Sequence, residues 1–428
     1  MDDPSVQADI ARIDLRDRLR VVDGRHGLSI ISRQHVGVVR LGPLHISIRP
    51  KMAVSRLWAV VTYALGLDAI PRSAPVSLDL SGDFTDLLCE VIGLEADRLW
   101  RLGVARNYEQ KHQWLASPRG RLDVRAFARS GPLVRAELPC SYHHFSADNI
   151  HNQLVLAVLR CATALCTSVR LRASLARSAQ QWSTVTTPRS LDVRLVSDAQ
   201  RASSRLTERY AAMARLAGVL LEGGGSGDTP QAGSHAVQGF LWNMAGVFEA
   251  FVGRFLREHS TTVDVLTQHR LTSVYTVLRP GPKLKSAPVP RPDLVAFDLD
   301  SRRPVAVLDT KYRDLWANSI SPGILYQLST YALAYDGPTS AVPAVVLYPA
   351  AEGVHDDMVL GLNVAAGEQR RIVFRSVDWC AAAAALQVGD VQGCRELARR
   401  WVEVSADRAA PTIGLRSEQR THLGQDMG

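Results

Sequence analysis

Residues 291–312, RPDLVAFDLDSRRPVAVLDTKY, give the strongest indication of the fold of the C-terminal half of the chain. Two short apolar runs, 294–297 and 305–308, flank a charged turn centred on Ser301, a pattern typical of a β-hairpin. Facing residues of an antiparallel pair lie about 5 Å apart. The hairpin is therefore expected to bring Asp293 and Asp309 together at one end.

Lys311 lies two residues beyond Asp309, so strand alternation places both side chains on the same face. Mg²⁺ binds proteins through one or two carboxylates and keeps several waters, and the backbone carbonyl of Thr310 is a further candidate ligand. A metal held here lowers the pKa of a bound water and stabilises charge on a phosphodiester. A lysine beside it orients the water or offsets developing negative charge. The bare spacing also fits a turn cap and a surface ion pair.

The flanking segments predict helices that contribute further polar side chains. Residues 322–335 show helical apolar spacing, and Gln327 and Tyr331, at positions i and i+4, point the same way. Upstream, residues 235–258 have a strong helical period with one apolar face. Glu249 falls at the edge of that face, where its carboxylate can reach a site beside the sheet.

This order of elements resembles the PD-(D/E)xK nuclease core: a helix with Glu, a strand with Asp, a strand with Asp-Thr-Lys, and a helix with Gln and Tyr. Four segments are more closely similar to the McrC family, the nuclease subunits of two-subunit, GTP-dependent restriction systems that cut DNA carrying modified cytosine. They are FLWNMAGVFEAFV (240–252), RPDLVAF (291–297), VLDTKY (307–312) and YQLSTYAL (326–333). Weaker matches, such as DNIHNQLVLAVL (148–159), extend the similarity over roughly residues 20–400.

The resemblance implies a deoxyribonuclease with Asp293, Asp309, Lys311 and Glu249 as catalytic residues. Mg²⁺ would be held by the two aspartates and the Thr310 carbonyl, and Gln327 and Tyr331 would be accessory or DNA-binding. It implies double-stranded DNA as substrate and an AAA+ GTPase partner resembling McrB. In that family the region before the nuclease forms a stalk that docks in the pore of the hexameric partner and stimulates GTP hydrolysis. The chain has no GxxxxGK[ST] phosphate-binding loop, so GTP is expected to bind only to the partner.

Composition is compatible with this interpretation. The 428 residues leave room for two or three domains, and the formal net charge of +8 suits a polyanionic partner. The six cysteines form no CxxC pair, so neither a zinc site nor a disulfide framework is indicated. The acidic, polar N-terminus does not resemble a signal peptide and no apolar run has the length of a membrane span. A cytoplasmic protein is expected.

The fold class expected is α/β, or α+β for the whole chain. A β-rich partner-binding region over residues 1–145 precedes a helical connecting region over 146–222. Within the first region, the short apolar runs between Leu19 and Pro50, broken by glycines, predict a small antiparallel sheet. Asn152 of that region is expected to tie down a neighbouring loop. A Gly/Ser-rich linker at 223–234 leads to a nuclease domain at 235–404, with a central mixed sheet flanked by helices. The polar tail, 405–428, is expected to be disordered.

Two other functions remain open from the sequence. The chain could be a non-catalytic adaptor that keeps the nuclease fold and only activates its GTPase partner. It could also be a stand-alone exonuclease similar to RecB, whose relatives pair Gln and Tyr on the helix after the catalytic strand. The presence of all four charged residues favours the nuclease subunit, and the long N-terminal extension argues against the exonuclease.

Overall fold

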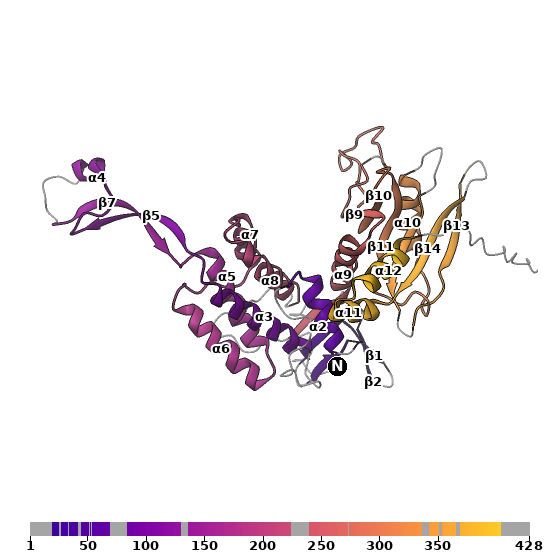
Figure 1. Ribbon diagram of the computed structural model, residues 1–428, viewed down its shortest axis with the longest axis horizontal. Helices are drawn as coiled ribbons and strands as arrows, with labels where there is room; N and C mark the ends of the chain where they lie inside the picture. The colour runs from indigo at the N-terminus through magenta and orange to yellow at the C-terminus, as the bar shows by residue number, and fades with distance from the viewer. Residues whose placement is uncertain are drawn as a thin grey trace, which may run out of the picture.

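The computed structural model describes residues 19–403, apart from 25–26, 33, 42–43, 51, 53, 69–83, 130–135, 224–238, 273, 336–341, 351–352 and 365–368. The predicted tail and nearly all of the predicted linker lie outside the described residues. Figure 1 shows a sheet-containing lobe, a helical region beside it, and an arm that projects from the helical region.

A six-stranded mixed sheet forms the centre of the first lobe, in the order β13-β14-β12-β11-β10-β9. Strands β11, β12 and β14 run parallel, whereas β9, β10 and β13 pair antiparallel with their neighbours. The strands are β9 (Val263–Thr267), β10 (Leu294–Asp298), β11 (Pro304–Thr310), β12 (Ala344–Pro349), β13 (Met358–Asn363) and β14 (Gln369–Val377). The predicted mixed sheet flanked by helices is confirmed.

The predicted hairpin is β10–β11. Leu294 pairs with Leu308 and Ala296 with Ala306. A β-bulge next to the turn then shifts the register, so that Phe297 pairs with Pro304. Alternate residues enter two different cores: Leu294 belongs to the core under one face, and Val295 to the core under the other. Because both faces are covered, both runs are apolar throughout, as expected for strands buried on both sides.

Helices cover the two faces of the sheet. Helix α9 (Met244–His259), with α11 (Trp379–Val388) and α12 (Val391–Val402), packs on one face. Helix α10 (Pro322–Ala334) packs on the other face through Leu328 and Ala332. The predicted helix at 322–335 is therefore confirmed.

The helix predicted over 235–258 begins later than expected. Phe240 and Leu241 lie in strand β8 (Gly239–Asn243), which pairs antiparallel with β3 (His35–Leu41). The helix starts at Met244, because the Asn243 side chain accepts a hydrogen bond from the Ala245 N–H and caps it. Distant pairing with β3 overrides the local helical period. The first part of the predicted helix, 235–238, is outside the described residues.

The N-terminal strands were expected to form one small sheet, and that prediction is wrong. β1 (Leu19–Gly24) and β2 (Gly27–Ser32) form a separate hairpin, whereas β4 (Leu44–Ile48), β3 and β8 form a three-stranded sheet. The short apolar runs do not specify which strand pairs with which.

A helical region follows the N-terminal strands. It comprises α2 (Val54–Ala64), α3 (Phe84–Arg101), α5 (Ile150–Leu165), α6 (Val169–Ser183), α7 (Val193–Arg201), the 3-10 helix η1 (Glu208–Tyr210) and α8 (Ala211–Gly223). A single hydrophobic core continues from this region into the lobe, from Leu57 of α2 to Trp401 of α12. No helix among the described residues is both long and apolar enough to span a membrane.

The arm is an antiparallel ribbon of β5 (Asn107–Leu115) and β7 (Leu138–Ser146), with β6 (Arg121–Leu122) and the short helix α4 (Val124–Arg129) at its outer part (Figure 1). At its root, Asn152 Nδ2 donates to the carbonyls of Ala105 and Ala147, at 2.9 and 2.6 Å. These residues precede β5 and follow β7, so the expectation that Asn152 ties down a neighbouring segment is confirmed.

Candidate active site

The hairpin register places Asp293 beside the end of β11. Asp293 Oδ2 accepts hydrogen bonds from the backbone N–H and the hydroxyl of Thr310, at 2.7 and 2.8 Å. Asp293 is thus fixed at the start of β10 by the residue that follows Asp309. The predicted convergence of the two aspartates at one hairpin end agrees with the structure.

Asp309 is 1% exposed, and its two oxygens have different partners. Oδ2 lies 2.5 Å from Lys311 Nζ, and Oδ1 accepts a hydrogen bond from Gln327 Nε2 at 3.3 Å. Strand alternation places Lys311 beside the Asp309 carboxylate, as expected from the sequence. Helix α10 brings Gln327 to the same carboxylate, a contact that the sequence did not predict.

Burial and the charge of Asp293 raise the pKa of Asp309 to about 6, and the charge and hydrogen bond of Lys311 oppose this rise. Burial, followed by the charge of Asp293, also raises the pKa of Glu249. One lysine does not offset three carboxylates in this region. Such an excess of negative charge favours a bound cation.

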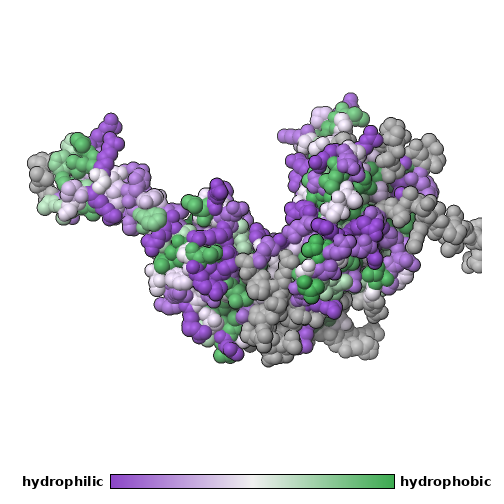
Figure 2. All heavy atoms as spheres, viewed as in Figure 1, coloured by the Kyte–Doolittle hydropathy of each residue, from purple (hydrophilic) through white to green (hydrophobic). Residues whose placement is uncertain are grey.

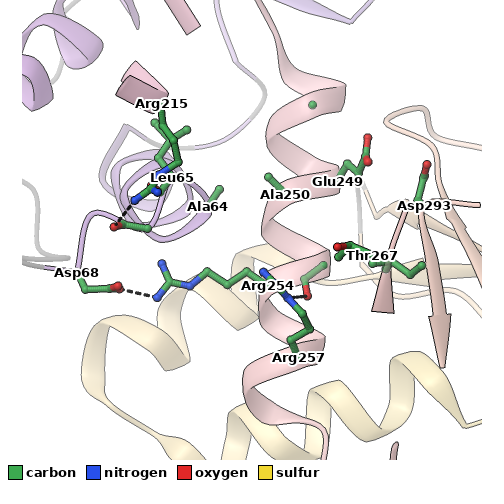
Figure 3. Close-up of a pocket in the computed structure, with 14 residues that line it drawn as sticks. Ala64, Leu65, Asp68, Arg215, Glu249, Ala250, Arg254, Arg257, Thr267 and Asp293 are labelled. Carbon is green, nitrogen blue, oxygen red and sulfur yellow. Dashed lines mark hydrogen bonds and ion pairs between the residues drawn. The ribbon is translucent and has the colours of Figure 1, made fainter. Parts of the chain in front are cut away.

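Glu249 extends from α9 toward the start of β10 (Figure 3). Its Oε1 accepts a hydrogen bond from Gln268 Nε2 at 2.9 Å. The backbone N–H of Gln268 in turn donates to the carbonyl of Asp293 at 2.9 Å, and Gln268 adopts a φ of 53°. A left-handed conformation is uncommon for a residue other than glycine and is often found at functional sites. Gln268 thus links Glu249 to Asp293.

Tyr331 lies one helical turn after Gln327 on α10. Gln327 Nε2 donates to the Tyr331 hydroxyl at 2.9 Å, and that hydroxyl donates to the Arg291 carbonyl at 3.3 Å. Tyr331 therefore orients Gln327 and anchors the segment before Asp293. It is 4% exposed, which leaves it little surface for direct contact with DNA.

Packing between α9 and the hairpin holds these groups in place. Tyr312, directly after Lys311, packs against Phe248 of α9 and Trp379 of α11, with ring centroids 5.9 and 5.6 Å apart. Gly253 allows α9 to approach the sheet, since a Cβ there would lie 3.2 Å from the Leu294 side chain. The helix carrying Glu249 is thereby pressed against the strand that follows Asp293.

The residues present fit a magnesium ion. Within the described part of the chain, no three His, Cys, Asp or Glu side chains are grouped to hold a metal. Mg²⁺, however, needs only one or two protein carboxylates and completes its shell with waters and substrate oxygens. Asp293 and Asp309 supply two carboxylates, and the Thr310 carbonyl remains a candidate ligand. All six cysteines are free, so no disulfide forms among them.

A family model described as McrBC 5-methylcytosine restriction system component matches residues 31–349, which is most of the chain. The chain belongs to this McrBC family. No curated protein sequence is similar enough to count as a match.

Two solved structures resemble this McrBC-family chain. One is a refined half-complex from a tetradecameric assembly of Thermococcus gammatolerans McrB AAA+ hexamers with bound McrC. It is 18% identical, with a TM-score of 0.57, and the match covers 94% of this chain and 89% of that one. The second is a cryo-EM structure of the Thermococcus gammatolerans McrBC complex. It is 19% identical with a TM-score of 0.42, and the match covers 60% of this chain and 83% of that one. The first likeness shows a shared fold over nearly the whole chain.

Sequence reasoning missed Gln268. It lies just after β9, a strand that no pattern predicted, and its contact with Glu249 depends on the packing of α9 against the sheet edge. No local signal in the sequence marks this residue, because its role follows from tertiary structure and from an unusual backbone conformation.

Proposed function

We propose that this chain is the Mg²⁺-dependent DNA endonuclease subunit of a GTP-dependent, modified-cytosine restriction system. The observation that carries the proposal is the set of charges at the end of the β10–β11 hairpin. A nearly fully buried carboxylate, Asp309, lies beside a second aspartate and is paired with a lysine. Burying such a group is unfavourable, and the arrangement suits a site for a cation and a phosphodiester.

We assign a different role in phosphodiester cleavage to each of the residues at this site. Asp293 and Asp309 would hold Mg²⁺, which supplies a water of lowered pKa and stabilises charge on the phosphodiester. Lys311, paired with Asp309, is placed to orient the attacking water or to offset charge in the transition state. Glu249, with its pKa raised, is placed near both aspartates to accept a proton or to orient a second water. Gln327 and Gln268 keep Asp309 and Glu249 in position.

The proposed partner is an AAA+ GTPase ring. One structure with the same fold is described as McrC bound to McrB AAA+ hexamers. Both faces of the ribbon β5–β7 are largely exposed along β5, and two-stranded ribbons are marginally stable alone in water. We therefore assign the projecting arm to contact with the ring, and the hairpin site to DNA cleavage.

If the chain were an adaptor, the arm would still contact the GTPase partner, but the residues at the end of the hairpin would catalyse no reaction. The pairing of Asp309 with Lys311 and the strained Gln268 both support a working site, because an adaptor has no need of a buried charge cluster. The exonuclease alternative leaves the arm without a role.

The test is to replace each aspartate separately. Asp293→Ala and Asp309→Ala should each abolish plasmid cleavage in the presence of the partner ring, and calorimetry should show weaker Mg²⁺ binding. Asp300→Ala, in the exposed turn of the same hairpin, is the matched control and should cut normally. Cleavage at the wild-type rate by either active-site variant would reject the assignment.

A further inference from the structure

A cavity of about 550 Å³ lies between α9 and the helical region. Figure 2 shows the molecule hollowed there, between the lobe with the sheet and the part that carries α7 and α8. Glu249 and Asp293 line the cavity on one side (Figure 3). Its other lining includes the arginines Arg215 of α8 and Arg254 and Arg257 of α9. The cavity thus joins the candidate active site to a basic surface contributed by two parts of the chain.

The three arginines differ in how their charge is balanced. Arg254 pairs with Asp68 and Glu258, at 2.7 and 2.6 Å, and lies over the Tyr63 ring. Arg215 donates only to backbone carbonyls of the loop after α2, and Arg257 donates to the Gly253 carbonyl at 3.3 Å. Among the described residues, no carboxylate lies within ion-pair distance of Arg215 or Arg257. Both are exposed, so each presents positive charge to whatever enters the cavity.

Gly66 leaves room for two of these guanidinium groups beside it. Its φ is 64°, and a Cβ there would lie 3.0 Å from Arg215 Nη2 and 3.5 Å from Arg254 Nη1. Partial burial of the guanidinium, and then the charge of Arg254, lower the pKa of Arg215. Two like charges held close together favour an anion between or beside them.

The spacing along α9 matches a nucleic-acid backbone. Arg257 follows Glu249 by eight residues, which is about 12 Å along the helix axis. Phosphates of one strand advance about 3.4 Å per nucleotide along a duplex. A strand whose scissile phosphate lies at Asp293 and Glu249 would therefore present a phosphate to Arg257 roughly three or four nucleotides away. Gly246 and Ala250 on this face leave room for the backbone to approach.

We propose that this cavity is the path of the DNA strand flanking the cut, with Arg257 and Arg215 binding its phosphates. The inference rests on the proposed function, and it deepens it by giving the helical region a direct part in substrate binding. The chemistry recognised is the phosphodiester backbone, so the contact is independent of base sequence.

The experiment measures binding rather than cleavage. The full chain is titrated against a fluorescein-labelled 30-base-pair duplex in EDTA, with anisotropy as the readout. Ala250 is exposed on the cavity lining, so Ala250→Glu and Ala250→Lys change the charge while preserving helix propensity. The glutamate should weaken binding about tenfold and the lysine should strengthen it. Arg257→Ala should weaken binding by about tenfold and reduce the slope of log K against log salt by about one.

Arg215 also binds the loop after α2, so Arg215→Lys is tested beside Arg215→Ala to retain charge. The lysine variant should bind more tightly than the alanine variant. Arg177, exposed on α6, is the charge-matched control, and Arg177→Ala should change the affinity less than twofold. Circular dichroism melting checks that each variant is folded.

Equal affinities for Ala250→Glu and Ala250→Lys would overturn the proposal, as would an Arg257→Ala effect no larger than that of Arg177→Ala. Competition by free phosphate or GTP at concentrations that leave the ionic strength unchanged would show a small-anion site instead, and would also overturn it. Charge-dependent DNA binding by a wild-type chain that never cuts would support this strand path and reject the nuclease function.

Discussion

Asp309 is an acidic side chain placed where ionisation is unfavourable. It is 1% exposed, and burial together with the charge of Asp293 raises its pKa to about 6. The positive charge of Lys311 offsets only part of this rise in the pKa of Asp309. At neutral pH, the metal-free chain therefore holds an ionised carboxylate in a position that destabilises the fold, as is common where function requires a strained or charged site.

The stability consequence has a defined sign. The folded chain binds the Asp309 proton more tightly than the unfolded chain does, because the pKa rises from 3.8 to about 6. The contribution to stability is present below about pH 4 and is lost as pH rises through about 6. Asp309→Asn removes this titration. In EDTA at pH 7.5 the variant should have a free energy of unfolding about 1–3 kcal/mol above wild type, and nearly equal to it at pH 4.

Urea unfolding at the two pH values measures this difference. Asp300→Asn, in the exposed turn between β10 and β11, is the control and should match wild type at both. A variant Asp309→Asn that is less stable than wild type at pH 7.5 would show that the Lys311 pair outweighs burial. It would contradict the view that the site is kept at the expense of stability.

At the scale of elements, the arm depends on a buried polar network at its root. Asn152 is fully buried and joins both ends of the ribbon through Ala105 and Ala147. The Tyr210 hydroxyl donates to Asn152 Oδ1 at 2.8 Å and accepts from the Ala105 N–H at 2.9 Å. The start of β5 and the end of β7 are thus tied to α5 and to η1.

Asn152→Ala should lower the free energy of unfolding by about 2–3 kcal/mol, because it leaves a buried hydroxyl and two carbonyls with fewer partners. It should also increase hydrogen exchange at the Ala105 amide. Gln153→Ala, one residue along the same helix with partly exposed contacts to Asp148 and Thr187, is the control. Asn149 Nδ2 also donates to the Ala105 and Ala147 carbonyls, at 2.8 and 3.2 Å. Unchanged exchange at Ala105 would therefore mean that Asn149 alone holds the arm root.

The elements that sequence analysis predicted well are those whose pattern is local. The β10–β11 hairpin and helix α10 follow from apolar runs and helical spacing in one short stretch, so Asp293, Asp309 and Lys311 could be brought together from sequence. The contact of Gln327 with Asp309 depends on how α10 packs against the sheet. Strand β8 could not, because its pairing with β3 joins residues about 200 positions apart in sequence. Helices α6 and α7 bury only three residues each, so the apolar stripe that marks each of them in the sequence is short.

At the scale of the whole molecule, the arm and the hairpin site lie in different parts of the chain (Figure 1). We therefore expect stimulation of the partner GTPase and DNA binding to be separable. Leu115 and Leu138 face each other in the ribbon, so an Asn-Gly turn can replace residues 116–137 and close the shortened hairpin. This variant should keep its DNA affinity and melting temperature but should lose stimulation of the partner GTPase.

GTP turnover by the partner and anisotropy with labelled DNA measure the two properties. The wild-type chain alone should neither bind nor hydrolyse GTP. Full stimulation by the shortened variant would show that the partner does not contact the outer arm. Tight GTP binding by the chain alone would reveal a nucleotide site that the sequence does not show.

If the nuclease site can be disabled separately from the activating arm, a single variant measured in two assays should show it. Lys311→Ala leaves both aspartates in place, so Mg²⁺ and DNA binding should be nearly unchanged. Losing the positioned charge should raise the barrier by roughly 3–4 kcal/mol, which slows plasmid cleavage about 10²–10³-fold. With the partner ring present, we expect Lys311→Ala to lose plasmid cleavage and to keep the GTP turnover of the ring. Cleavage at the wild-type rate, or a wild-type chain that stimulates GTP turnover but cuts under no metal or partner condition, would contradict it.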